Sequence, residues 1–329
     1  MGIRGARIWG LGSYVPYRVL TNADLEKMID TTDEWIVSHT GIRERHIASD
    51  DQAASDLAFI AAERALAAAG IEPTDIGLVI VATVTGDYSF PATACLIQNR
   101  LGATNAAAFD LGVGCTGFIN AVAVASQFVA TGAYDYVLVV AAEMLSRITN
   151  WTDRSTCVLF GDGAGAVVVG PGDVGAGVLS FVMQSFGEYG PLLTMPAGGS
   201  RRPCDAEALA AHLNTLHMEG HEVFKLAVRG TPDVAELALA KAGVDAHEIS
   251  WIVMHQANLR IMDAAARKLE IPDERVYVNI ERYGNTSGAS IPLALDEMQR
   301  DGKLKPGDLL LLIGFGAGFS LASMVVKWG

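Results

Sequence analysis

The sequence predicts an α/β fold built of two similar halves, residues 1–173 and 174–329. Two observations carry this prediction: a segment of the first half recurs in the second, and the strands of both halves are nearly continuous apolar runs. Such strands are buried on both faces, which is typical of parallel sheets covered by helices. The 329-residue chain is 50% apolar and 19% charged, so its core can be large enough to offset the chain entropy.

The recurring segment is residues 61–82, which align without gaps to residues 234–255. Each copy is predicted to form an alanine-rich helix, a glycine that ends it, an acidic turn and an apolar strand. Because the glycine, the acid and the strand keep register, a shared alanine-rich composition does not explain the match. The identities are Ala62, Glu63, Ala65, Leu66, Ala67, Ala69, Gly70 and Ile76 in the first copy and Ala235, Glu236, Ala238, Leu239, Ala240, Ala242, Gly243 and Ile249 in the second.

The remaining elements follow the same order in each half. The first half continues with a predicted strand over 106–111, a glycine turn, a helix over 116–130 and a strand over 136–142. The second continues with a strand over 276–280, a turn over 283–288, a helix over 290–300 and a strand over 309–313. The glycine-rich residues 161–165 precede a strand over 166–169 rather than a helix, so we predict a turn there and not a phosphate-binding loop.

Composition excludes several classes of protein. Lys and Arg total 24 against 37 Asp and Glu, a net charge of −13, so we expect no nucleic-acid partner. The mean hydropathy is +0.29, but the apolar runs are too short to span a membrane. The cysteines are too scattered for a disulfide framework, and without a CxxC spacing we expect no metal site. We therefore expect a cytoplasmic protein.

Three residues of different chemistry fall at related positions of the two halves. Cys115 lies in a glycine-rich turn before a helix, where the helix N-terminus favours a thiolate. His255 ends the strand of the second repeat copy and could donate a hydrogen bond or carry a proton. Asn285 lies in the corresponding turn of the second half, where its amide could face a developing oxyanion. Taken singly, each has an ordinary structural explanation; their shared placement makes them candidate catalytic residues.

A rival interpretation starts from the same turn. Gly112, Gly114 and Gly117 satisfy the GxGxxG pattern between a strand and a helix, which is typical of dinucleotide-binding sites. Such a site needs an acid about 20 residues further on, and Glu143 follows Gly117 by 26 positions. A nicotinamide-dependent oxidoreductase therefore stays a distant alternative, although the repeat favours the first interpretation because it supplies Asn285.

At these residues the sequence resembles the thiolase-like condensing enzymes, specifically the β-ketoacyl-acyl-carrier-protein synthase III family. The resemblance covers nearly the whole chain. It implies two pseudo-symmetric halves in a layered α-β-α-β-α arrangement, and a cytoplasmic homodimer without cofactor or metal. The implied reaction joins a short acyl-CoA primer to malonyl-acyl carrier protein and starts fatty acid synthesis. The motifs that carry it are Asp33-Glu-Trp-Ile, Thr40-Gly-Ile-Arg-Glu-Arg, Phe160-Gly-Asp-Gly-Ala-Gly, His255-Gln-Ala-Asn-Leu-Arg, Gly284-Asn-Thr-Ser and Phe315-Gly-Ala-Gly-Phe.

The resemblance also implies roles for individual residues. Cys115 would carry the acyl group, its backbone N–H and that of Ala317 would form the oxyanion hole, and His255 and Asn285 would hold the malonyl thioester oxygen. Coenzyme A would meet Trp35, Arg154 and Asn258, and Phe90 would reach the partner subunit's acyl pocket. The residues expected to meet the acidic carrier protein are Lys225, Arg260, Arg267 and Lys268.

Departures from the family pattern concern coenzyme A affinity at His39 and the shape of the acyl pocket at Gly114, Thr116 and Leu321, so the primer stays open. His39 stands where the family commonly has arginine near the coenzyme A site, and Leu321 stands where it commonly has tryptophan. Related enzymes with the same three residues make starters for secondary metabolites or transfer acyl groups to other acceptors. A divergent synthase or acyltransferase of the same fold is therefore the nearer alternative function.

Overall fold

The computed structural model describes residues 4–329, and its strands form one continuous order, β12-β11-β13-β14-β8-β1-β7-β6-β4-β5. A single residue pair, Ala6 with Gly177, joins β1 to β8 at the centre of this order. The strands therefore form two sheets that meet at one point: β1-β7-β6-β4-β5 and β8-β14-β13-β11-β12. Counted outward from β1 in one sheet and from β8 in the other, equivalent strands occur in the same order. The chain therefore contains two copies of the same sheet.

The first sheet contains β1 (Gly5–Tyr14), β4 (Ile76–Ala82), β5 (Ala107–Leu111), β6 (Tyr136–Met144) and β7 (Asp162–Gly172). The second contains β8 (Gly177–Ser185), β11 (Trp251–Met254), β12 (Val276–Tyr277), β13 (Leu309–Gly316) and β14 (Ser320–Lys327). Short pairs form from β2 (Arg18–Thr21) with β3 (Glu44–Ile47) and from β9 (Leu193–Thr194) with β10 (His217–Met218).

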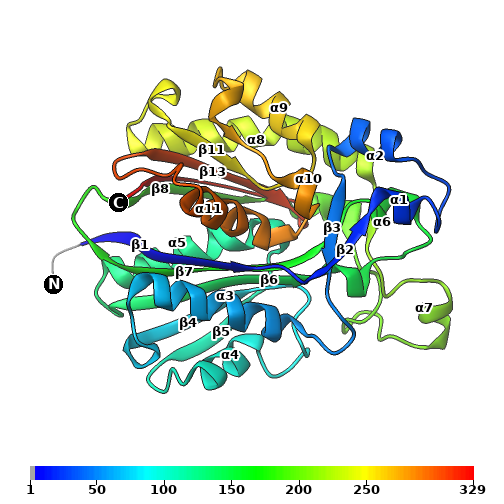
Figure 1. The fold of residues 1–329 in the computed structure, drawn as a ribbon, viewed down its shortest axis with the longest axis horizontal. Coiled ribbons are helices and arrows are strands. Elements are labelled where there is room, and N and C mark those ends of the chain that lie inside the picture. Colours follow the sequence, from blue (N-terminus) through cyan, green and yellow to red (C-terminus); the bar gives the residue numbers. More distant parts are fainter. Residues whose placement is uncertain (1–3) are drawn as a thin grey trace.

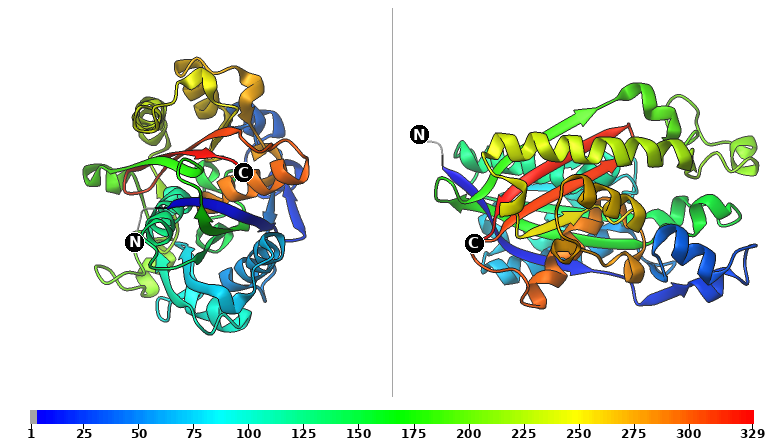
Figure 2. Two further views of the ribbon diagram at one scale, coloured as in Figure 1. Left: turned by 90° about the vertical axis from the view of Figure 1, so that its left-hand side faces the viewer. Right: turned by 90° about the horizontal axis from the view of Figure 1, so that it is seen from above.

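Helices form three layers around the two sheets, as the predicted layered fold requires (Figure 1). The outer face of the first sheet is covered by α3 (Ala54–Ala69) and α4 (Thr93–Leu101), and that of the second by α8 (Gly220–Ala242) and α9 (Leu259–Lys268). Figure 2 shows α8 running along the molecule over the strands of the second sheet. Between the sheets lie α5 (Gly117–Ala130) and α11 (Ser290–Arg300). A helix enclosed in this way is apolar on nearly every side, as α5 is.

The smaller helices are α1 (Asn22–Leu25), α2 (Asp33–Thr40), α6 (Arg154–Cys157), α7 (Ala206–Ala210) and α10 (Ile280–Tyr283). Several of them, α1, α2, α6 and α7, gather with β2 and β3 at one end of the layers, on the right in Figure 1. Among residues 4–329 no helix is both long and apolar enough to cross a bilayer.

The backbone confirms the internal repeat in detail. Helices α3 and α8 each end at a glycine in the left-handed region, Gly70 with φ 64° and Gly243 with φ 67°. Each glycine N–H donates a hydrogen bond to the carbonyl of the residue three positions earlier, at 3.3 Å and 3.2 Å. Glycine is required because other residues pay a steric cost at this φ. The two copies therefore share their helix ends as well as their helices and strands.

The prediction of parallel sheets was only partly right. In each sheet four strands run in the same direction, but β7 and β14 are antiparallel to both of their neighbours. The turn predicted over 161–165 is also wrong beyond Gly161, because β7 begins at Asp162. The glycine content there serves close packing: a Cβ on Gly165 would lie 2.6 Å from the Pro292 Cβ of α11. The strand predicted over 276–280 is shorter, since α10 begins at Ile280.

Candidate active site

The two pseudo-equivalent turns that carry Cys115 and Asn285 pack against each other at the start of the central helices. Cys115 lies in a single 3₁₀ turn, residues 114–116, between β5 and α5. Asn285 precedes the corresponding 3₁₀ turn, residues 287–289, which leads into α11. The contact is close, because a Cβ on Gly288 would lie 3.3 Å from the Gly114 carbonyl oxygen. His255 joins this group from the end of β11 through the first residue of α11, as described below.

The turn around Cys115 leaves no room for larger neighbours. A Cβ on Gly316, the last residue of β13, would lie 2.9 Å from the Cys115 Cβ. Burial raises the pKa of the Cys115 thiol to about 12, with a smaller contribution from the nearby Glu143 carboxylate, whereas a hydrogen bond with Ser287 opposes the shift. The expectation of a thiolate favoured by the helix N-terminus is therefore wrong. The sulfur carries a proton that has to leave when it attacks.

His255 is held as a neutral imidazole. It is 1% exposed, and this burial lowers its pKa to about 3. Its Nδ1 lies 2.8 Å from the Ser290 Oγ, which also accepts a hydrogen bond from the Gln256 N–H at 3.2 Å. If Nδ1 also donated to this oxygen, the buried Ser290 hydroxyl hydrogen would be left without an acceptor, which is costly. The Ser290 hydroxyl therefore donates to Nδ1, and Nε2 carries the ring proton as a donor.

The side-chain amide of Asn285 has a fixed orientation as well. Its Oδ1 accepts a hydrogen bond from the Ser287 N–H at 2.8 Å, so the Nδ2 group is left to donate elsewhere. Its backbone is anchored to the strand-like segment before β7, because Asn285 N–H donates to the Leu159 carbonyl at 2.8 Å and Gly161 N–H donates to the Asn285 carbonyl at 3.0 Å. The site thus combines one thiol with two neutral hydrogen-bond donors.

Ala317, the second predicted oxyanion-hole residue, lies beside the Cys115 turn. It follows β13 directly, and its backbone nitrogen would lie 3.9 Å from a Cβ on Gly114. The Ser320 Oγ donates to the Ala317 carbonyl at 3.0 Å, which holds the peptide unit that follows Ala317.

The three residues predicted to meet coenzyme A come together on the side of the site formed by α2, α6 and α9. The Arg154 guanidinium lies 4.4 Å from the Trp35 ring centroid, and the Trp35 ring stacks on His39 at 4.5 Å. The Asn258 Nδ2 donates to the His39 carbonyl at 2.9 Å. His39, a departure from the family pattern, therefore contacts both Trp35 and Asn258.

The four predicted docking cations lie on α8 and on α9, which pack together. Two of them are paired with acids: Lys225 with Glu222 at 2.9 Å and Lys268 with Asp233 at 2.6 Å. Arg260 and Arg267 are exposed. The positive charge of this surface therefore comes chiefly from the two arginines.

Sequence reasoning missed Ser287 and Ser290 and assigned Glu143 to the wrong task. Both serines lie in the turn already singled out for Asn285, so their proximity was the available signal. Glu143 is 1% exposed and accepts a hydrogen bond from the Thr85 Oγ at 2.6 Å. A carboxylate enclosed in this way cannot bind a ribose, which contradicts the dinucleotide alternative.

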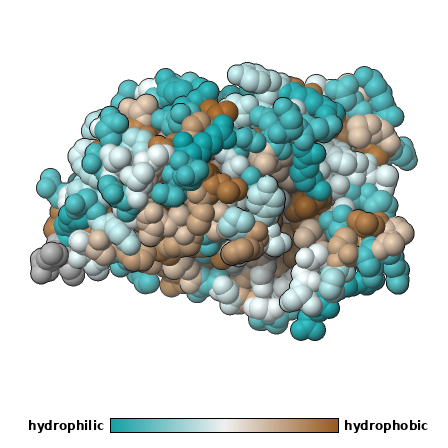
Figure 3. Space-filling model, turned by 90° about the horizontal axis from the view of Figure 1, so that it is seen from below, coloured by the Kyte–Doolittle hydropathy of each residue, from teal (hydrophilic) through white to brown (hydrophobic). Residues whose placement is uncertain are grey.

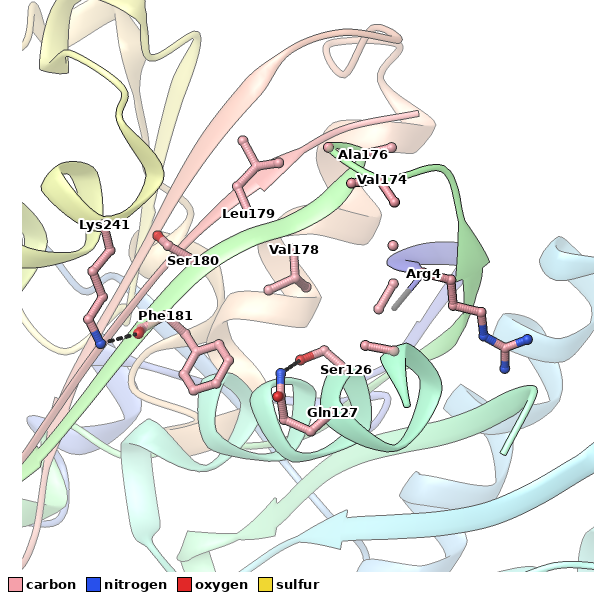
Figure 4. A pocket seen from close by; sticks show the side chains of 14 residues that line it. Arg4, Ser126, Gln127, Val174, Ala176, Val178, Leu179, Ser180, Phe181 and Lys241 are labelled. Carbon is pink, nitrogen blue, oxygen red and sulfur yellow. Dashed lines mark hydrogen bonds between the residues drawn. The ribbon is translucent and has the colours of Figure 1, made fainter. Parts of the chain in front are cut away.

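A hollow of about 510 Å³ lies away from these residues (Figure 4). It is lined by Ser126 and Gln127 near the C-terminal end of α5, by β8 residues including Phe181, and by Lys241 of α8. Cys115 lies at the other end of α5, about 20 Å away at 1.5 Å per helical residue. The hollow therefore does not belong to the site.

A thiol with two neutral donors on a doubled α/β fold defines an acyl-transferring condensing enzyme with a thiolase-like fold. Residues 109–187 match the family model "3-Oxoacyl-[acyl-carrier-protein (ACP)] synthase III", and residues 239–328 match its C-terminal counterpart. A β-ketoacyl-[acyl-carrier-protein] synthase III of Caldanaerobacter subterraneus is 53% identical over 323 residues, 98% of each chain. The chain belongs to the β-ketoacyl-acyl-carrier-protein synthase III family.

Solved structures agree with this assignment. The crystal structure of 3-oxoacyl-[acyl-carrier-protein] synthase III from Aquifex aeolicus has a TM-score of 0.91 and 44% identity, covering 98% of this chain and 100% of that one. The priming β-ketosynthase of the R1128 polyketide biosynthetic pathway has a TM-score of 0.93 and 39% identity, covering 99% and 97%. The predicted fold and family are confirmed.

Proposed function

We propose that the chain catalyses the decarboxylating Claisen condensation of a short acyl-CoA with malonyl-acyl carrier protein, the step that starts fatty acid synthesis. The observation that supports this proposal is the packing of the Cys115 turn against the turn that holds Asn285, together with the two oriented neutral side chains, His255 and Asn285. Relatives named for this reaction share about half of the sequence over nearly its full length.

In the first step the Cys115 sulfur attacks the acyl-CoA carbonyl. The backbone N–H groups of Cys115 and Ala317 stabilise the oxyanion of the tetrahedral intermediate, a contribution typical of preorganised donors in a water-poor site. Coenzyme A leaves, and the acyl group stays on Cys115 as a thioester.

In the second step malonyl-acyl carrier protein loses carbon dioxide and its thioester becomes an enolate. His255 and Asn285 donate hydrogen bonds to the oxygen where this negative charge develops. The carbanion attacks the acyl-Cys115 thioester and forms the β-ketoacyl product. A neutral imidazole suits this task because it has to donate a hydrogen bond and not remove a proton, and the reaction needs neither metal nor cofactor.

The two acyl carriers reach this site by different contacts. The Trp35–Arg154 pair offers an aromatic ring and a guanidinium plane to the nucleotide of coenzyme A, and Asn258 lies beside them for the pantetheine arm. Lys225, Arg260, Arg267 and Lys268 attract the acidic carrier protein. Because the whole chain carries a net charge of −13, a local positive surface is needed for an acidic partner, and nucleic acid remains disfavoured.

The first sheet ends in an edge that supports a homodimer. Strand β5 is the outermost strand, and an uncovered edge strand invites pairing with another chain. Phe109 on β5 is partly exposed and Phe90 is 88% exposed. Figure 3, seen from below, shows hydrophobic side chains gathered on the side where α4 and β5 lie in Figure 1. In a dimer joined along β5, Phe90 enters the acyl pocket of the partner subunit.

A second function follows from the similarity to the priming β-ketosynthase of a polyketide pathway. The same chemistry would then load a starter for a secondary metabolite. In either pathway the enzyme works in the reducing cytoplasm, which agrees with four unpaired cysteines, two of them exposed.

Intact-protein mass spectrometry tests the proposal. The purified chain is mixed with a panel of acyl-CoAs, the adduct is located by peptide mapping, and malonyl-acyl carrier protein is then added. An adduct on Cys115 that disappears on this addition, with formation of a β-ketoacyl-acyl carrier protein, is the expected result. A persistent adduct would indicate another acceptor, and the absence of any adduct would refute Cys115 as the nucleophile.

A further inference from the structure

The loop that carries Ala317 is the turn of the hairpin between β13 and β14. The register of these two strands ends at the pair Gly316 and Ser320, so residues 317–319 form the loop. Both ends of the loop are fixed: β14 also pairs with β8 on its other side, and a Cβ on Gly316 would lie 3.0 Å from the Cys115 nitrogen. The course of the chain between these ends therefore sets the position of the Ala317 N–H.

Two buried hydroxyl groups tie this loop to the turn of the nucleophile. The Ser320 Oγ donates to the Ala317 carbonyl at 3.0 Å, and the Thr116 Oγ lies 3.2 Å from the Ser320 Oγ. Thr116 directly follows Cys115 in the 3₁₀ turn before α5. Thr116 is fully buried and Ser320 is 7% exposed. Buried hydroxyls need hydrogen-bond partners within the protein, so these two depend on each other.

The hydrogens of the two hydroxyls give this chain a direction. Ser320 has a single hydroxyl hydrogen, which it donates to the Ala317 carbonyl. The contact between the two hydroxyl oxygens therefore takes its hydrogen from Thr116. The Val113 carbonyl also lies 3.3 Å from the Thr116 Oγ, but a bond to Val113 alone would leave the two oxygens facing each other with no hydrogen between them, which is costly. The chain thus runs from Thr116 through Ser320 to Ala317.

The backbone contacts of the loop leave the Ala317 N–H available. Within residues 4–329 it has no backbone acceptor, and Ala317 is partly exposed. Phe319, at the other end of the loop, is held instead: its N–H donates to the Phe186 carbonyl at 3.0 Å, and the Phe186 N–H donates to the Phe319 carbonyl at 2.7 Å. The hydroxyl chain is therefore the contact that holds the side of the loop nearest the nucleophile.

We propose that Thr116 and Ser320 are positioning residues for the oxyanion hole: their hydroxyl chain keeps the Ala317 N–H aligned with the Cys115 N–H while the sulfur attacks the acyl thioester. Both residues act through the backbone, and neither touches the substrate. A donor that is held in place before the reaction needs no reorganisation when the charge develops. This inference rests on the proposed function, because the oxyanion forms only when Cys115 attacks a carbonyl.

The first experiment measures acylation of the Ser320→Ala variant. With acetyl-CoA, or the primer that acylates the wild type, the single-turnover rate of coenzyme A release at saturating acyl-CoA is expected to fall about 10- to 100-fold. Deleting an oxyanion donor altogether costs about 10²- to 10³-fold, and here the N–H is kept but is less well placed. The acyl-CoA concentration that gives half the maximal rate should stay near that of the wild type, because the residues proposed to bind coenzyme A lie on α2, α6 and α9.

Alkylation of Cys115 by iodoacetamide separates the oxyanion hole from the nucleophile. This reaction displaces iodide from a saturated carbon and forms no oxyanion, so its rate depends on the thiol and its accessibility alone. The rate in Ser320→Ala should stay near that of the wild type. Peptide mapping has to follow the modification of Cys115 itself, because Cys95 and Cys204 are exposed. A loss in acylation without a loss in alkylation assigns the effect to the oxyanion hole.

Changes at Thr116 test the other link of the chain. Thr116→Val keeps the shape of the side chain and removes the hydroxyl, so acylation should fall while alkylation is kept. Thr116→Ser keeps the hydroxyl and should recover most of the acylation rate. Because both substitutions break the same chain, adding Thr116→Val to Ser320→Ala should cause little further loss. Thr116→Val also carries the comparison if Ser320→Ala does not fold.

Ser323→Ala is the matched control. Ser323 lies on the same strand, is fully buried, and its Oγ donates to the Leu312 carbonyl of β13 at 3.0 Å. The substitution removes a buried serine hydroxyl with the same kind of bond across the same hairpin, but away from the loop. Its unfolding temperature should therefore fall about as much as that of Ser320→Ala, while its acylation rate stays near that of the wild type.

Three results would overturn the inference: wild-type acylation rates in folded Ser320→Ala and Thr116→Val, equal losses in acylation and alkylation, or a loss of acylation in Ser323→Ala as large as in Ser320→Ala. Each of them leaves the proposed function standing, since the wild type is still acylated at Cys115. If no acyl-CoA acylates the wild type, the proposed function fails, and this inference fails with it.

Discussion

The Ser290→Ala variant tests whether the tautomer of His255 is set by the protein. The substitution removes the hydroxyl that donates to Nδ1 at 2.8 Å and that accepts from the Gln256 N–H at 3.2 Å. The imidazole then loses the contact that keeps its proton on Nε2, where it faces the malonyl thioester. Leaving a buried polar atom unsatisfied costs about 1–3 kcal/mol, which corresponds to about a 5- to 150-fold loss of rate.

The two partial reactions distinguish this effect from general damage. The rate of malonyl-acyl carrier protein decarboxylation, measured as release of carbon dioxide, should show a loss within that range. Coenzyme A release in the acylation step should change little, because His255 takes no part in it. The loss should also be smaller than the ~2.7–4 kcal/mol typical of deleting an oxyanion donor altogether. An unchanged decarboxylation rate in a folded Ser290→Ala protein would refute the tautomer argument, and an equal loss in acylation would refute the division of labour.

Four further outcomes are expected. Cys115→Ala should abolish acyl-adduct formation by mass spectrometry while the unfolding temperature stays close to that of the wild type, since one small side chain replaces another. His255→Ala should keep acylation but lose condensation by about 2.7–4 kcal/mol or more, measured as the ratio of the two rates. Arg154→Ala should raise KM for acyl-CoA without a matching loss in malonyl-acyl carrier protein decarboxylation, because the guanidinium over Trp35 is proposed to bind the nucleotide of coenzyme A. The pKa of His255 is about 3 in the folded protein, against 6.5 in the unfolded chain. As pH falls below 6.5 only the unfolded state binds the extra proton, so the free energy of unfolding falls by about 1.4 kcal/mol per pH unit between these two values. Urea unfolding at pH 6.5 and 4.5 should therefore show a smaller loss of stability in His255→Gln than in the wild type.

Local sequence signals predicted the elements that local interactions determine. The glycines that end α3 and α8, Gly70 and Gly243, take the left-handed conformation that only their residue type adopts easily. The helix over 290–300 matches α11, and the placement of Cys115 and Asn285 in equivalent turns is confirmed by the packing of those turns. Their catalytic roles, and the boundary between the halves near residue 173, remain predictions.

Long-range interactions explain what the sequence did not predict. The direction of β7 depends on its pairing with β1 and β6, and neither neighbour is specified by the apolar run itself. The pKa of Cys115 depends on burial by residues far away in the chain, including Gly316, which packs closely against the Cys115 backbone. Glu143 shows the same limit: its spacing from Gly117 suggested a nucleotide ligand, but the end of β6 meets the turn of the opposite half.

The two sheets have equivalent strands, but the residues at the ends of these strands differ between the halves. Strand β6 ends against the turn after Asn285, with the Glu143 carboxylate at the contact; the corresponding strand β13 ends against the Cys115 turn, with Gly316 at the contact. A perfectly symmetric molecule would place two thiols or two amides face to face. Two thiols could store an acyl group but not stabilise an enolate, and two amides could stabilise an enolate but not store an acyl group. Specialisation of one copy as the acyl carrier and of the other as the donor side means that neither half, expressed alone, contains a complete site.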